Sequence, residues 1–132
     1  MTNFAKQDTD ISQLLLGNNY SKKGVTILSG EVITTGMLLG VVTASQKLAQ
    51  CKSGASDGSQ IPKYVAVSDI DASAGDVVGE VGASGQFNLE KIVFDGSDTI
   101  ETVVSDETFY NYLRGLGILV LPSKNYGSYD NA

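Results

Sequence analysis

The sequence predicts a mainly β domain, a small β-barrel or β-sandwich, with one short α-helix near the C-terminus and an extended N-terminal arm. Two observations lead to this prediction. Fifteen glycines separate short runs rich in Val, Ile, Leu and Thr, which is typical of many short strands joined by turns. Of the 132 residues, 42% are hydrophobic and 18% charged, so the chain can bury a core as one domain.

The N-terminal segment differs in composition from the rest. Residues 1–20 are polar and are expected to form the arm, residues 21–122 the β-rich domain, and residues 123–132 a polar C-terminal tail. Such an arm can be a loose terminus or a segment that becomes ordered on a partner. Its apolar residues are Phe4, Ile11, Leu14, Leu15 and Leu16.

The first half of the domain is expected to contain a hairpin. A long apolar strand over 37–43 turns at 44–46 into a return strand over 47–51, where polar and apolar residues alternate. The segment 52–60 combines glycines with serines and is predicted to be an exposed, mobile loop. An earlier strand is predicted over 25–28.

The second half is expected to hold further strands and the helix. A turn at Ser84-Gly85 should separate two strands. Ser105-Asp106-Glu107 should supply the cap of the helix and the acids of its first turn, and Pro122 should end the last strand. The predicted strands cover 64–67, 76–83, 86–89 and 118–121.

Composition excludes several classes of function. Lys and Arg number 9 against 15 Asp and Glu, giving a net charge of -6, so nucleic acid is not an expected partner. The chain has no His and one cysteine, Cys51, which removes imidazole catalysis and most transition-metal sites, and no cofactor is expected. We find no signal peptide and no apolar run near the roughly 20 residues of a membrane span, so no membrane partner is expected.

Carboxylates are the main remaining candidates for catalysis. Asp69, Asp71 and Asp76 form the densest acidic cluster, but the alternating oxygen ligands and final Glu of a calcium loop are missing. A solvated turn is the favoured interpretation, and a hydrolase using Asp69 and Asp76 is the alternative. Cys51 has no identifiable catalytic base and is interpreted as a passive thiol.

Several segments, taken in order, resemble the bacteriophage head decoration proteins, the family of the phage lambda capsid-stabilising protein. The resemblance spans roughly residues 14 to 121. Its segments are 14–17, 24–30, 35–43, 57–60, 65–67, 71–76, 85–88, 105–108 and 117–120.

This resemblance implies a virion structural protein and no enzyme. It implies a homotrimer that binds the major capsid protein lattice on the outside of the expanded head, at three-fold or quasi-three-fold sites, and stabilises it against internal DNA pressure. Synthesis would take place in the host cytoplasm. In that family the arm faces the capsid, which makes Phe4, Ile11 and Leu14 to Leu16 candidate capsid-binding residues.

A second class of function is open. A small β-barrel could be a glycan- or receptor-binding module on a virion or cell surface. Its aromatic platform would then consist of Tyr20, Tyr64, Tyr126 and Tyr129.

Overall fold

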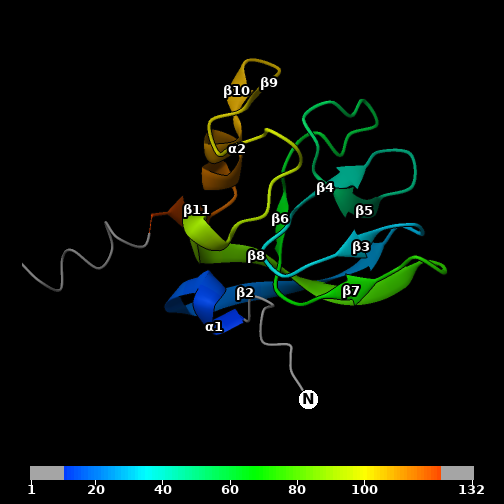
Figure 1. The fold of residues 1–132 in the computed structure, drawn as a ribbon, viewed down its shortest axis with the longest axis horizontal. Coiled ribbons are helices and arrows are strands. Elements are labelled where there is room, and N and C mark those ends of the chain that lie inside the picture. Colours follow the sequence, from blue (N-terminus) through cyan, green and yellow to red (C-terminus); the bar gives the residue numbers. More distant parts are fainter. Residues whose placement is uncertain (1–10, 123–132) are drawn as a thin grey trace, which may run out of the picture.

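The computed structural model describes residues 11–122, so Phe4 and the predicted tail lie outside the described residues. The fold is mainly β with one short helix near the C-terminal end, as predicted. Figure 1 shows a twisted sheet with α2 (Phe109–Gly115) and the small β9–β10 hairpin, Val103–Val104 and Glu107–Thr108, standing above one end.

The main sheet closes on itself. Its six strands run in the order β11-β8-β2-β5-β4-β6, and an additional β6–β8 pairing joins five of them into a barrel. β11 adds to the outside of β8. The strands are β2 (Leu15–Ile27), β4 (Leu38–Val42), β5 (Lys47–Gln50), β6 (Tyr64–Ala66), β8 (Val77–Asn88) and β11 (Ile118–Leu121).

Three smaller elements complete the described chain. A two-stranded sheet pairs β3 (Val32–Ile33) with β7 (Ile70–Asp71). A single helical turn, α1 (Ile11–Leu14), precedes β2, and a 3-10 turn, η1 (Leu89–Lys91), follows β8. The predicted 37–43 and 47–51 hairpin is confirmed as β4 and β5, which pair antiparallel, and the last predicted strand is confirmed as β11.

The predicted turn at Ser84-Gly85 is wrong. β8 continues through both residues, and the strand it pairs with, β2, shifts register between Leu15 and Tyr20. Gly85 has a φ of +136°, and a Cβ there would lie 2.7 Å from the Tyr20 Cβ. Glycine therefore permits a close strand crossing and an irregularity in the ladder, where the sequence suggested a chain reversal.

The predicted start of the helix is also wrong. α2 begins at Phe109, and its N-cap is Thr108, whose hydroxyl accepts from the Asn111 amide at 3.1 Å. Ser105 and Asp106 have φ values of 53° and 70° and form the two-residue tip of the β9–β10 hairpin. Ser and Asp suit both a helix cap and a tight turn, so the local sequence did not distinguish them.

The predicted loop over 52–60 is held to the domain at Ser53 and at Asp57, whose backbone carbonyl accepts from the Thr43 amide at 2.9 Å. The Ser53 hydroxyl donates to Asp98 at 2.6 Å, and the Ser53 amide donates to the same carboxylate at 2.9 Å. Ser59 is only 3% exposed, against the predicted exposure of this segment. Its hydroxyl donates to Asp57 at 2.6 Å, which satisfies the buried polar group.

Strands β4 and β6 separate two hydrophobic clusters. Leu38 and Val65 face the first cluster, between the sheet and α2, while the adjacent Leu39 and Ala66 face the second, inside the barrel. Because both faces of these strands are buried, their sequences are continuously apolar. Phe87, Phe109, Leu113 and Ile118 belong to the first cluster, and Ile27, Leu48 and Val81 to the second.

Gly40 provides a test of this packing. A Cβ on Gly40 would lie 2.2 Å from the Ser59 carbonyl oxygen, whereas nothing lies within 4 Å of one on Gly24. We expect Gly40→Ala to lower the free energy of unfolding by about 1–3 kcal/mol, because backbone must shift, and Gly24→Ala to have little effect. Urea denaturation measures both, and equal stability of the two variants would contradict the packing described.

Candidate functional site

The described part of the predicted arm is anchored on the domain. Leu14 is 0% exposed and belongs to the first hydrophobic cluster, and Leu15 packs against that cluster opposite Phe87. The Asn88 side-chain amide donates to the Gln13 carbonyl at 3.3 Å. The chain therefore has a fixed position on the base of the domain from about Gln13 onward.

Two further predicted capsid-binding residues are less buried than Leu14. Ile11 and Leu16 are half-buried, one at the start of α1 and one at the start of β2. Phe4 lies outside the described residues. The structure thus buries Leu14 in the core and leaves Ile11, Leu15 and Leu16 partly accessible, with Leu15 packed against the core, and capsid binding by this group stays a prediction.

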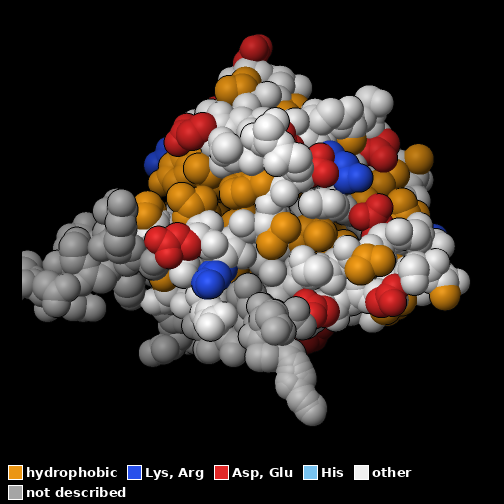
Figure 2. Space-filling model, in the orientation of Figure 1, with side chains coloured by type: hydrophobic (Ala, Val, Ile, Leu, Met, Phe, Trp, Pro, Cys, Tyr) orange, Lys and Arg blue, Asp and Glu red, His pale blue; other side chains and the backbone are white. Residues whose placement is uncertain are grey.

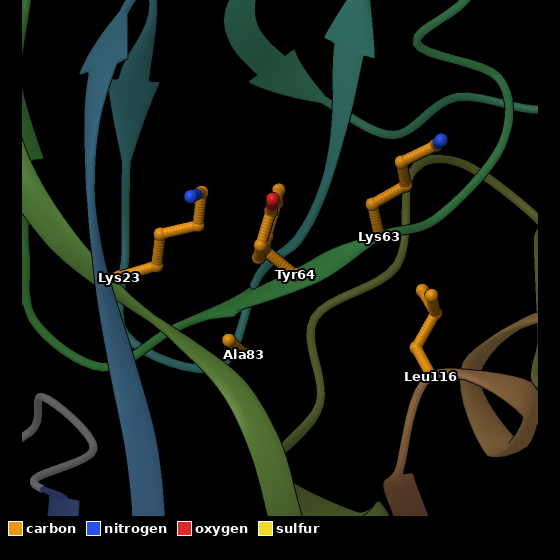
Figure 3. Close-up of a pocket in the computed structure, with 5 residues that line it drawn as sticks. All are labelled: Lys23, Lys63, Tyr64, Ala83 and Leu116. Atoms are coloured by element: carbon orange, nitrogen blue, oxygen red, sulfur yellow. The ribbon is translucent and has the colours of Figure 1, made fainter.

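A second candidate site, which the sequence analysis missed, is a cavity of about 240 Å³ at one end of the barrel. We call it the barrel-mouth pocket. Figure 3 shows Lys23 and Lys63 on either side of Tyr64. The lining residues are Lys23, Lys63, Tyr64, Ala83 and Leu116.

Strand register explains why this pocket exists. Lys23 pairs with Val81, a barrel-interior residue, so its side chain follows the inward face of β2. β2 pairs with β5 only at Ile27 and Leu48, so the barrel opens before that point. The only signal in the sequence was that Lys23 lies on the same face of β2 as the apolar residues Val25 and Ile27. That face could be recognised as the inward one only once the strand pairing was known.

The pocket is positively charged in an acidic protein. The ion pairs among residues 11–122 join Lys22 to Glu80 at 3.5 Å and Lys47 to Asp76 at 2.5 Å. Lys23 and Lys63 take part in neither pair, and no carboxylate lines the pocket. Its chemistry therefore suits a negatively charged group with an apolar neighbour.

The acidic residues singled out from the sequence have separate structural roles. Asp69 accepts hydrogen bonds from the Thr35 amide and hydroxyl at 2.8 and 3.0 Å, and Asp71 accepts from the Ser73 amide at 2.9 Å. Asp76 pairs with Lys47, whose ammonium, together with the Ser29 amide, lowers the pKa of that carboxyl. Within residues 11–122, no three His, Cys, Asp or Glu side chains gather as metal ligands would.

The lone thiol is enclosed. Cys51 is 3% exposed and donates to the Gln60 carbonyl at 3.4 Å. Burial, followed by the nearby carboxylates of Asp98 and Asp95, raises the pKa of the Cys51 thiol to about 12. A buried thiol that keeps its proton is neither a nucleophile nor a metal ligand, in agreement with the passive interpretation.

The tyrosines proposed as an aromatic platform do not form one in the described chain. Tyr20 packs against the first hydrophobic cluster and Tyr64 against the second. Tyr126 and Tyr129 lie outside the described residues.

Acidic side chains are scattered over the visible face of the molecule (Figure 2). Among residues 11–122, no helix has the length and apolar content needed to cross a membrane.

These features define a small closed β-barrel protein whose N-terminal segment is anchored on the core. The family model of bacteriophage lambda head decoration protein D matches residues 6–107. This chain belongs to that family of phage head decoration proteins, which supports a structural role in the virion capsid. A search of curated proteins found no match.

Leu14 and Leu16 of the N-terminal segment provide a test of their different positions. Leu14→Ala should lower the free energy of unfolding by about 2–5 kcal/mol, because it leaves a cavity in the first cluster. Leu16→Ala, at a half-buried position, should cost clearly less. Thermal or urea unfolding measures both variants, and a smaller loss in Leu14→Ala than in Leu16→Ala would refute the anchor.

The thiol makes a separate prediction about reactivity. With a pKa of about 12, only roughly one Cys51 thiol in ten thousand is ionised at about pH 8. We therefore expect a disulfide reagent to label the folded protein at least about a hundredfold more slowly than the urea-unfolded protein. Equal rates in the two states would show that Cys51 is accessible and ionisable.

Proposed function

We propose that this chain is a cement protein, a homotrimer that binds the outside of the expanded phage head at three-fold or quasi-three-fold positions. There it would tie neighbouring major capsid proteins together and resist the internal pressure of packaged DNA. The observation that carries the proposal is the family match over residues 6–107, which includes part of the arm and all five strands of the barrel.

The physical basis of stabilisation is preferential binding. A protein that binds the assembled lattice and not the free subunits shifts the equilibrium toward the lattice. A trimer has three arms, so each contact can be weak while the combined attachment is strong. The net charge of -6 supports this role, because a protein on the outer surface gains nothing from affinity for DNA.

The arm contributes to the proposal in two parts. Leu14 holds the base of the arm on the core, and residues 1–10 with Ile11 and Leu16 supply the capsid contacts. Backbone pairing with a capsid segment would set the register, and apolar side chains would add affinity. The half-buried state of Ile11 and Leu16 supports this division of roles.

Deletion of residues 1–10 tests the arm. This deletion ends before Leu14 and therefore leaves the first hydrophobic cluster intact. We expect the deleted protein to unfold at the same urea concentration as the full chain but to bind expanded shells of its own phage at least about tenfold more weakly, measured by co-sedimentation.

One control variant and one further arm variant accompany this experiment. Val32→Ala changes an exposed apolar residue on β3 and should leave shell binding unchanged. Ile11→Ala should weaken binding in the same direction as the deletion. Full shell binding without residues 1–10 would overturn the arm proposal, and failure of the full chain to bind shells would overturn the cement function itself.

A further inference from the structure

The β9–β10 hairpin carries an acidic tip. Glu107 and Thr108 pair with Val104 and Val103, which leaves Ser105 and Asp106 as the two turn residues. Asp106 is exposed, and Val103 beside the tip is 59% exposed. Figure 2 shows an acidic side chain, with a hydrophobic one below it, at the outer end of this hairpin.

The tip has an unfavourable backbone for its sequence. Both turn residues have positive φ, 53° and 70°, as in the hairpin turn that Asn-Gly forms most easily. Asp tolerates this region better than most residues but less well than glycine. The chain thus keeps a carboxylate at the outermost point of the hairpin, where glycine would fit with less strain.

The hairpin is held rigidly at one end of α2. The Tyr112 hydroxyl donates to the Val104 carbonyl at 2.7 Å, and the Asn111 side-chain amide donates to Glu107 at 2.9 Å. Phe109 and Leu113 fix α2 on the first hydrophobic cluster. The acidic tip therefore has a defined direction relative to the barrel.

The barrel-mouth pocket lies at the other end of the same helix. Leu116, the C-cap of α2, lines the pocket and is 47% exposed. The seven residues of α2 span about 10 Å, and the hairpin extends further from the N-terminal end (Figure 1). Since α2 is a fixed spacer, the tip of one molecule does not reach its own pocket.

We propose that the acidic tip of one copy of this chain binds in the barrel-mouth pocket of a second copy. Asp106 lies between Lys23 and Lys63, and Val103 packs against Leu116. The tip and the pocket are complementary, because the tip offers a carboxylate and an apolar side chain and the pocket offers two lysines and a leucine. The proposal rests on the proposed trimer, because a contact between two different surfaces generates a closed ring when the rotation allows it.

Self-association measured by sedimentation equilibrium tests this contact. We expect Asp106→Asn and Lys63→Glu each to raise the dissociation constant of the trimer at least about tenfold. Two matched controls, Glu101→Gln and Lys52→Glu, change the same charges at exposed sites outside the pocket and tip, and should have little effect. A wild-type chain that stays monomeric at every concentration would overturn the proposal.

Asp106→Gly separates assembly from folding. Glycine relieves the positive φ and removes the carboxylate, so the variant should unfold at a higher urea concentration and yet associate at least about tenfold more weakly. A merely structural role for Asp106 would not change these two quantities in opposite directions. Association as tight as that of the wild type would contradict the contact.

Charge exchange provides the final arm of the test. Combining Asp106→Lys with Lys63→Asp should restore part of the association that either single change weakens, because one pair is re-formed between copies while Lys23 is unchanged. If the double variant associates no more tightly than either single variant while folding normally, the contact is overturned. Co-sedimentation with shells distinguishes the two proposals. If the wild-type chain binds shells but the charge variants associate as tightly as the wild type, only this interface is rejected. If the wild-type chain does not bind shells, only the cement function is rejected.

Discussion

Closure of the barrel by β8 is the constraint on which the rest of the structure depends. Val81 pairs with Lys23 on one side and Ala66 on the other, and Gly82 pairs with Lys22 and Val65. Val81 and Gly82 therefore join β2 to β6 and close the barrel. Beyond them β8 continues to Asn88, with β2 on one side and β11 on the other. β8 therefore contributes Val81 to the second hydrophobic cluster, inside the barrel, and Phe87 to the first.

This arrangement couples the two candidate surfaces to the core. The N-terminal segment begins at the far end of β8, where Leu15 lies opposite Phe87, and the barrel-mouth pocket lies near Ala83. Both surfaces thus depend on one strand for their position. Under the proposed function, such rigidity would favour binding to a shell and to a second copy, because little conformational entropy is lost on binding.

Much of the fold could be predicted from the sequence, and the failures have physical causes. The β4–β5 hairpin followed from an apolar run, a turn and an alternating return strand, and β11 followed from an apolar run that ends before Pro122. The turn at Gly85 failed because a glycine that permits close strand contact looks the same in sequence as one that reverses the chain. The helix start failed because Ser105 and Asp106 fit two local structures, and the pairing of Val103 with Thr108 selected the hairpin.

The candidate sites were predictable to different degrees. The apolar residues of the N-terminal segment stood out in a polar context, but their sequence could not show that Leu14 belongs to the core. Lys23 and Lys63 are 40 positions apart in the chain, and only the β6–β8 and β2–β8 pairings bring them to one barrel end. Long-range register carries no local signature, so the pocket was not found from sequence.

The most direct test of the account is an electron cryo-microscopy reconstruction of expanded shells of the phage that encodes this chain, mixed with the purified protein. The account predicts added density at the three-fold and quasi-three-fold positions, with the α1 end of each barrel facing the shell. Bare shells under saturating protein, or density with the α1 end facing outward, would contradict it.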